Sequence, residues 1–210
     1  MSLVGEGGAL FDARDVSRET MERLEHYAAL LRKWNAAINL VSKSTLEELW
    51  TRHFLDSAQI FDYCPDSGRH WADLGSGGGF PGLVIAILAA ESNHDLRVTL
   101  VESDIRKATF LRTVARETGV SVQVLSDRIE NLPPLSADVL SARALSALPQ
   151  ILEFAFRHMA TDGLALFPKG ATHAEELEAA HKIWTFSCNA FASQTDPRSV
   201  ILSIGRLAHV

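Results

Sequence analysis

Residues 73–82, "DLGSGGGFPG", place five glycines and a proline between two strongly apolar segments. The residues at 70–74 are typical of a short buried strand, and Pro81 suits the first turn of a following helix. Glycines at such a turn allow a ligand to approach the backbone, and the first amides of a helix have no partners within it. We therefore expect a strand, a turn and a helix that together bind a nucleotide-like ligand.

Two registers of the glycines indicate different ligands. Gly77, Gly79 and Gly82 satisfy G-x-G-x-x-G, the dinucleotide fingerprint, but this pattern is weak and here straddles a Phe-Pro helix start. Asp73, Gly75, Gly77 and Gly79 give D-x-G-x-G-x-G, the first motif of S-adenosylmethionine-dependent methyltransferases. An acidic residue suits that cofactor, because its methionine end carries an ammonium group and it has no pyrophosphate. We therefore expect S-adenosylmethionine to bind near Asp73, Gly75, Ser76, Gly77 and Gly79.

Glu102 supports a nucleoside ligand in either register. It ends the second predicted strand, where an acidic side chain can accept hydrogen bonds from both ribose hydroxyls. The alternative is a solvated carboxylate at a strand end. Its pairing with the glycine loop favours the cofactor role.

The N-terminal part of the chain is predicted to be helical. The 210 residues suffice for one large domain, or for one domain with an appendage. Up to Pro65, apolar residues recur at helical spacing in two segments, 21–38 and 46–61. Residues 44–47, "STLE", resemble a capping box that opens the second helix. We therefore expect an N-terminal helical extension over residues 1–64.

After Pro65 the sequence alternates strand-like and helix-like blocks, which indicates a parallel sheet with helices on both faces. The short buried strands are predicted at 70–74, 97–102, 120–126, 137–142 and 163–168. Residues 184–192 and 199–205 are predicted to form an antiparallel hairpin at the sheet edge. We therefore expect an α/β, Rossmann-like class I methyltransferase fold over residues 65–210, with a mostly parallel seven-stranded sheet, forming one compact unit with the extension.

Composition excludes several classes of protein. A hydrophobic fraction of 47% beside 22% charged residues is ordinary for a globular protein, and a net charge of −6 argues against indiscriminate coating of nucleic acid. The longest apolar run, 80–90, is too short to span a bilayer, and the N-terminus lacks the build of a signal peptide. We expect a cytoplasmic protein with no membrane partner.

Cys64 and Cys188 lack a metal-type spacing, so neither a disulfide nor a metal site is expected.

Further motifs give the chain a specific resemblance. Through these motifs and the glycine loop, the chain resembles the ribosomal RNA small subunit methyltransferase G family, also called glucose-inhibited division protein B. The matching stretches are "LLRKWNAAINLVS" (30–42), "RHFLDS" (52–57), "VESDIRKATFL" (101–111), "DRIENL" (127–132), "SARALSAL" (141–148) and "FPKG" (167–170). The resemblance implies methyl transfer from S-adenosylmethionine to N7 of guanine 527 in 16S rRNA. We expect the rRNA to be bound within the small ribosomal subunit and the protein to act as a monomer.

The resemblance also assigns cofactor contacts by motif. They would be Gly75 and Phe80 from the loop, Ile129 and Glu130 after the third strand, and Arg143 after the fourth. Ile129 and Glu130 would border the adenine; the alternative is a loop residue and a surface acid. Arg143 can hold the methionine carboxylate or an rRNA phosphate, or form an ordinary salt bridge.

No general base is expected for this reaction. Guanine N7 has an exposed lone pair and no proton to remove, so the enzyme has only to align the reacting atoms. His53 and Asp56 lie three residues apart on a predicted helix, where they share a face. They either line the entrance for guanine or cofactor, or form a local hydrogen bond that fixes the helix. Lys169, at another strand end, is either an rRNA phosphate contact or a solvent-exposed turn lysine.

RNA binding would need a local basic face on this acidic chain. Its predicted members are Arg106, Lys107, Arg112, Arg116, Arg143 and Lys169. Two other functions stay open at this point. The same fold can methylate a small molecule, because a fold does not determine a substrate. The chain can also be a non-catalytic nucleotide-binding or ribosome-associated protein.

Overall fold

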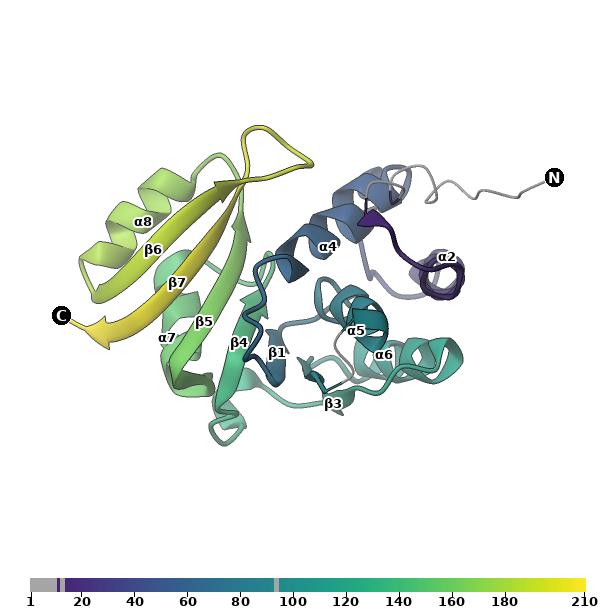
Figure 1. Cartoon of the computed structure of the whole chain (residues 1–210), viewed down its shortest axis with the longest axis horizontal. Coiled ribbons are helices and arrows are strands. Elements are labelled where there is room, and N and C mark those ends of the chain that lie inside the picture. The colour runs from purple at the N-terminus through teal and green to yellow at the C-terminus, as the bar shows by residue number, and fades with distance from the viewer. Residues whose placement is uncertain (1–10, 12–13, 93–94) are drawn as a thin grey trace.

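A single mixed sheet of seven strands organises the molecule (Figure 1). The computed structural model describes residues 11, 14–92 and 95–210. Most of the N-terminal residues, from which we expect no signal peptide, therefore lie outside the described residues. The strand order is β3-β2-β1-β4-β5-β7-β6, and only the pairs that include β7 are antiparallel. The strands are β1 (His70–Leu74), β2 (Arg97–Val101), β3 (Gln123–Leu125), β4 (Ala137–Ala142), β5 (Met159–Lys169), β6 (Trp184–Ala192) and β7 (Val200–His209).

Helices cover both faces of the sheet (Figure 1), which confirms the predicted fold class. Successive strand residues serve opposite faces: Val139 belongs to one hydrophobic core and Leu140 to the other. The first core is completed by α2 (Arg18–Asn35), α4 (Asp56–Phe61), α5 (Gly82–Ser92) and α6 (Ile105–Thr118). The second is completed by η3 (Ile129–Asn131), α7 (Leu148–His158) and α8 (His173–His181). In the described ranges, no helix is long and apolar enough to cross a membrane.

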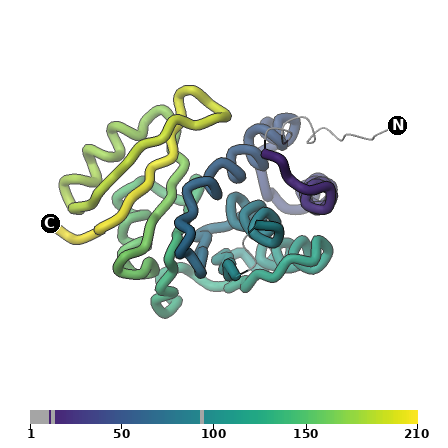
Figure 2. Tube along the Cα trace, viewed as in Figure 1, coloured from purple at the N-terminus to yellow at the C-terminus, as the bar shows by residue number. Residues whose placement is uncertain are grey.

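The N-terminal helices share the first core with the sheet. The buried Tyr27 ring of α2 stacks on Phe80 of the glycine loop at 5.3 Å between centroids, and contacts Phe54 at 5.0 Å. Its hydroxyl donates a hydrogen bond to the carbonyl oxygen of Gly78. Figure 2 shows the same arrangement, with α2 lying beside α5 and α6. The division of the chain at residue 64 stays a prediction.

Four predicted strands have different bounds in the structure, and one of them, the strand predicted at 199–205, extends to His209 as β7. The strand predicted at 120–126 shrinks to β3, because the amide of Val120 bonds back to the carbonyl of Ala115 and closes the end of α6. The fifth strand starts earlier, at Met159, which follows α7 directly and pairs with Ala137. The second strand ends at Val101, one residue before Glu102.

The second N-terminal helix is broken into three pieces. They are α3 (Lys43–Leu46), the π-helical turn η2 (Trp50–Leu55) and α4. The capping box predicted at residues 44–47 is wrong. Ser42, whose backbone is extended, caps α3 by accepting a hydrogen bond from the Thr45 amide. In the π turn, the Asp56 amide reaches the carbonyl of Thr51 five residues back.

A buried carboxylate joins three elements beneath the glycine loop. Asp73, at 0% exposure, accepts hydrogen bonds from the Ser141 hydroxyl of β4 at 2.8 Å and from the Gly82 amide of α5 at 3.2 Å. Burial raises the pKa of Asp73 to about 6, against the effect of those hydrogen bonds. The side chain therefore fixes the loop from below.

The protein's own atoms exclude side chains from much of the glycine loop. A Cβ on Gly82 would collide with Leu100, and would lie 2.8 Å from the Asp73 carboxylate. A Cβ on Gly79 would lie 2.5 Å from the Tyr27 hydroxyl. Gly77 differs: its φ of +56° favours glycine, but a Cβ there would meet only the Gly75 carbonyl, at 3.8 Å. The open space for a ligand is therefore at Gly77.

Gly82→Ala is expected to destabilise the protein by roughly 1–3 kcal/mol, because the new methyl overpacks the junction of Leu100 and Asp73. Urea unfolding measures the change. Gly170→Ala is the matched control, since a Cβ there meets nothing within 4 Å, and it should change stability by less than about 0.5 kcal/mol. Equal effects of the two substitutions would contradict the packing argument.

Asp73→Asn is expected to change how stability depends on pH. The folded-state pKa of Asp73, about 6, exceeds the ordinary value of 3.8, so the native state binds more protons between these values. The wild-type free energy of unfolding should therefore fall, relative to the variant, as the pH rises from about 4 to about 6, by up to roughly 3 kcal/mol. Urea unfolding of both proteins across this range measures it. A constant difference would show that Asp73 does not titrate there.

Candidate functional site

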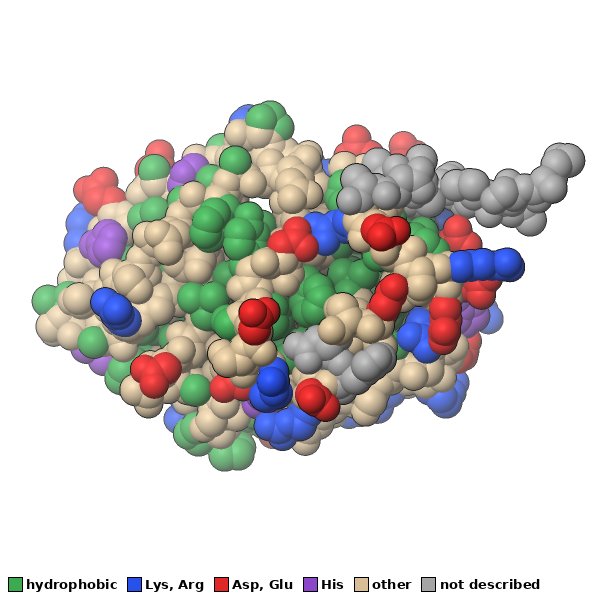
Figure 3. All heavy atoms as spheres, in the orientation of Figure 1, with side chains coloured by type: hydrophobic (Ala, Val, Ile, Leu, Met, Phe, Trp, Pro, Cys, Tyr) green, Lys and Arg blue, Asp and Glu red, His purple; other side chains and the backbone are tan. Residues whose placement is uncertain are grey.

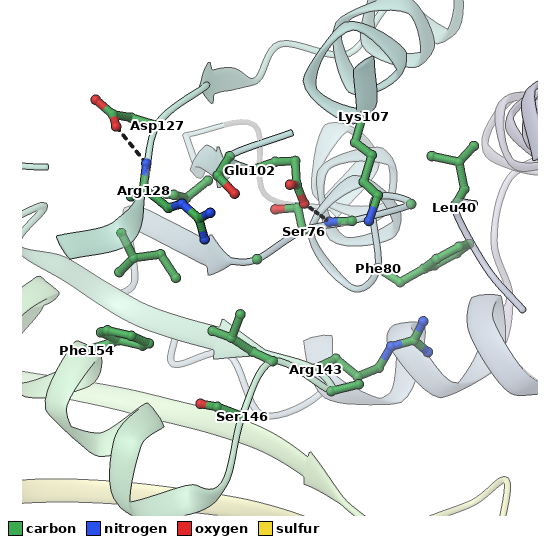
Figure 4. Close-up of a pocket in the computed structure, with 18 of the residues that line it drawn as sticks. Leu40, Ser76, Phe80, Glu102, Lys107, Asp127, Arg128, Arg143, Ser146 and Phe154 are labelled. Atoms are coloured by element: carbon green, nitrogen blue, oxygen red, sulfur yellow. Dashed lines mark hydrogen bonds between the residues drawn. The ribbon is translucent and has the colours of Figure 1, made fainter. Parts of the chain in front are cut away.

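A cavity of about 540 Å³ lies where β1, β2 and β4 end (Figure 4). Its size falls within the range of small-molecule sites. In Figure 4, Ser76 and Glu102 face Ser146 and Phe154 across it. The predicted site residues that line it are His53, Gly75, Ser76, Gly77, Phe80, Glu102, Ile129, Glu130 and Arg143.

The Glu102 carboxylate is fixed by backbone amides on both sides. One oxygen accepts a hydrogen bond from the amide of Gly77 and the other from the amide of Asp104, each at 2.8 Å. The residue is only 8% exposed, so the alternative of a solvated carboxylate is wrong. A carboxylate oxygen can accept more than one hydrogen bond, so both oxygens can still accept from a ligand.

The loop after β3 forms another wall of the cavity. Ile129 is buried, and its carbonyl contacts the His158 imidazole at 3.0 Å, whereas Glu130 is exposed at the rim. The Asp127 carboxylate orders the turn by accepting from the amide of Arg128 at 2.7 Å and from the Asn131 side chain at 3.0 Å. An apolar surface beside a polar rim suits a nucleobase plane.

Sequence reasoning missed several residues of the cavity wall. Some of them lie within or beside the stretches that carry the family resemblance, so proximity to those motifs was the available signal. The others, on α7, carried no signal in the sequence. The missed residues are Leu40, Val41, Gly78, Val101, Ser103, Lys107, Asp127, Arg128, Ala144, Leu145, Ser146, Gln150 and Phe154.

Arg143 connects the cavity to the N-terminal helices. One terminal nitrogen lies 2.6 Å from Nδ1 of His53, and the other donates to the carbonyl of Arg52 at 3.1 Å and to the Asp56 carboxylate at 3.4 Å. The guanidinium carbon lies 5.1 Å from the centre of the Phe80 ring, on which His53 also stacks. Figure 4 shows the Arg143 side chain running below Phe80 and away from Ser146.

These contacts define the tautomer and the protonation state of His53. An arginine only donates hydrogen bonds, so Nδ1 of His53 is the acceptor, and Nε2 carries the proton that faces the Thr45 hydroxyl at 2.9 Å. Burial, with the charges of Arg143 and Arg52, lowers the pKa of His53 to about 3. The imidazole is therefore neutral near pH 7. The alternative of a His53–Asp56 hydrogen bond is wrong, because both side chains bind Arg143.

A second cavity of about 350 Å³ adjoins the first and shares Arg143, Ala144 and Ser146 with it. Asp56 and Lys169 line this second cavity rather than the first. The Lys169 ammonium donates to the Glu176 carboxylate at 2.7 Å and to the Ser146 carbonyl at 3.3 Å. Its side chain is 9% exposed, so the alternative of a solvent-exposed turn lysine is wrong.

Two other predicted cofactor contacts do not reach the first cavity. Asp73 lies buried under the loop, with its carboxylate on Ser141 and Gly82. Gly79 faces Tyr27. Both support the cavity from behind instead of lining it.

The predicted basic face does not form one surface. Arg106, Arg112 and Arg116 are exposed on α6, whereas the Arg143 and Lys169 side chains are 18% and 9% exposed in the cavity walls. Two of the α6 arginines also face neighbouring carboxylates in ion pairs. On the side shown in Figure 3, acidic and basic side chains are interspersed.

Known proteins resemble this chain in sequence and in fold. The profile of the family GidB, rRNA small subunit methyltransferase G, matches residues 20–197. "Ribosomal RNA small subunit methyltransferase G" of Ruegeria sp. (strain TM1040) is 56% identical over 90% of this chain and 92% of its own length. The protein of the same name from Cereibacter sphaeroides (strain ATCC 17029 / ATH 2.4.9) is 54% identical over 93% and 95%.

Solved structures share the fold at low sequence identity. A TehB-like SAM-dependent methyltransferase from Corynebacterium glutamicum has a TM-score of 0.54 at 17% identity, covering 86% of this chain and 96% of its own. A SAM dependent methyltransferase from Aquifex aeolicus has a TM-score of 0.57 at 14% identity, covering 84% and 96%. The sheet is thus that of the Rossmann-like class I methyltransferases. With the family profile and the relatives over most of its length, the chain belongs to the rRNA small subunit methyltransferase G (GidB) family.

Proposed function

We propose that this protein transfers a methyl group from S-adenosylmethionine to N7 of guanine 527 in 16S rRNA. The proposal includes the small ribosomal subunit as the substrate particle, a cytoplasmic location and action as a monomer. Family membership supports an rRNA methyltransferase that uses S-adenosylmethionine. The observation that carries the proposal is the Glu102 carboxylate, held beside the open backbone of Gly77 in a cavity of nucleoside size.

The residues of the first cavity fit this cofactor. The two Glu102 oxygens can accept from ribose hydroxyls while they hold the amides of Gly77 and Asp104. The buried Ile129 offers an apolar surface for the adenine, and the absence of a Cβ at Gly77 leaves room beside the loop. At the opposite end of the cavity, the Arg143 guanidinium provides a positive charge for a carboxylate.

The reaction needs alignment more than proton transfer. When bound, S-adenosylmethionine supplies a methyl on a positively charged sulfur; the guanine N7 lone pair forms the new N–C bond as the S–C electrons return to sulfur, and no proton leaves. His53 is unsuited to act as a base, since Arg143 occupies its lone pair. His53 and Phe80 instead hold the Arg143 side chain in place at the junction of the two cavities.

The proposed activity is tested with radiolabelled S-adenosylmethionine and small ribosomal subunits that lack the modification. We expect one labelled base, mapped to guanine 527 by chain cleavage at 7-methylguanine. Naked 16S rRNA, assayed in parallel, identifies the preferred substrate particle. Cofactor binding without transfer to either RNA would reject the proposal and favour another acceptor.

Glu102→Gln is expected to weaken S-adenosylmethionine binding roughly 10- to 100-fold, because the carboxylate loses its charge and one of its acceptors becomes a donor facing a backbone amide. Isothermal titration calorimetry measures the dissociation constant. Glu178→Gln is the matched control, because the Glu178 side chain is 78% exposed on α8. This variant should bind S-adenosylmethionine with the affinity of the wild type. An unchanged affinity in the Glu102 variant would remove this carboxylate from the cofactor site.

A further inference from the structure

The second cavity is a separate polar chamber beside the cofactor cavity. Its wall includes a lysine and a glutamate in contact at 2.7 Å, Lys169 and Glu176. We propose that this cavity receives the target guanine after it leaves its base stack, and that the Lys169–Glu176 ion pair recognises O6 and N1–H of that base. The inference rests on the proposed function and adds the residues that select the base.

The position of the cavity suits the acceptor base. Arg143, Ala144 and Ser146 belong to the walls of both cavities, so a base in the second cavity presents one edge to the first. A volume of about 350 Å³ lies within the range of small-molecule sites. Enzymes that do chemistry on a base act on single strands or take the base out of the stack into a pocket, and this cavity offers such a pocket.

The polar groups follow the same order as the atoms of guanine. Glu176 contacts Lys169, and Lys169 contacts the Ser146 carbonyl at 3.3 Å, at the wall that the two cavities share. Around guanine, N1–H is followed by O6 and then by N7. A base with N1–H at Glu176 and O6 at Lys169 therefore turns N7 toward the first cavity. Its Watson–Crick edge is read while its N7 lone pair stays exposed.

Both members of the pair have hydrogen-bonding capacity left for a base. An ammonium group has three donors, and Lys169 uses two of them, on Glu176 and Ser146. One Glu176 oxygen accepts from Lys169 and from the Leu148 amide, while the other has only a 3.4 Å contact with the Thr172 hydroxyl. Burial raises the pKa of Glu176, but the hydrogen bonds from Lys169 and Leu148 outweigh it, so the carboxylate stays ionised.

The pair also predicts that adenine is rejected, although its N7 has a comparable lone pair. Adenine carries an amino group where guanine has O6, and a bare N1 where guanine has N1–H. Its amino group would meet the ammonium of Lys169, and its N1 lone pair would meet the carboxylate of Glu176. The first contact would place a donor against a donor, and the second an acceptor against an acceptor. Guanine instead offers an acceptor to Lys169 and a donor to Glu176.

The first arm of the test changes the base and keeps the wild-type protein. Small subunits are assembled from ligated 16S rRNA that carries guanine, inosine, 2-aminopurine or adenine at the target position. Inosine keeps O6 and N1–H, and should be methylated within a few-fold of guanine. 2-Aminopurine and adenine lack both groups, and kcat/KM should fall at least about tenfold for each. Equal transfer to guanine and 2-aminopurine would overturn the inference.

The second arm changes the ion pair. Glu176→Gln can donate to adenine N1, so the ratio of guanine to adenine transfer should fall at least about tenfold, and Lys169→Met should lower this ratio too. Cofactor affinity should stay within about twofold of the wild type, since neither residue lines the first cavity. Glu175→Gln and Lys182→Met are the matched controls, because both residues are exposed, and they should leave the ratio unchanged.

Each remaining outcome has a distinct meaning. If the wild type methylates guanine and the Lys169 variant loses equal activity on guanine and adenine, the lysine contacts the RNA backbone and the inference is wrong. If guanine is methylated and both variants keep the wild-type ratio, the base is recognised elsewhere. If the wild type methylates none of the assembled subunits, the proposed function itself fails. A variant that does not fold leaves the first arm decisive.

Discussion

The fold of the site depends on one buried carboxylate. Asp73 joins the end of β1 to β4 through Ser141 and to the start of α5 through the Gly82 amide. A charged group without water is stable only when hydrogen bonds or neighbouring charges compensate its burial. Because Asp73 lies in β1 and its two partners lie in β4 and α5, the carboxylate couples the geometry of the loop to that of the sheet. The backbone at Gly77 is therefore presented by a rigid support.

Arg143 provides the second link, between the sheet and the N-terminal helices. Its guanidinium binds side chains that come from the π-helical turn and from the start of α4, and it lies over an aromatic ring of the glycine loop. The π turn accommodates one more residue than an α-helical turn, and it places His53 and Asp56 around the same arginine. The wall between the two cavities is thus built from parts of the chain that lie far apart in sequence.

The sequence predicted the sheet, its edge hairpin and a ligand cavity at the glycine loop that Gly75, Ser76, Gly77 and Phe80 line, because strand alternation and the glycine pattern are local signals. It did not predict where Asp73 points, since a carboxylate before the glycines suits a ligand and a backbone amide equally well. The partners of His53 and Lys169 were also beyond it, because Arg143 lies 90 residues after His53, and Glu176, although only seven residues after Lys169, belongs to the following helix α8. The π turn and the Ser42 cap were missed because short-range signals, such as the "STLE" pattern, compete there with tertiary packing.

The contact between Tyr27 and the glycine loop has an evolutionary consequence. The tyrosine hydroxyl and the Leu83 side chain both occupy the space that a side chain at Gly79 would need, and the φ of +96° at this position favours glycine. A smaller residue at position 27 would therefore not be enough to admit a side chain at position 79. Glycine should persist there in descendants of this protein, although neither position 27 nor position 79 lines the first cavity.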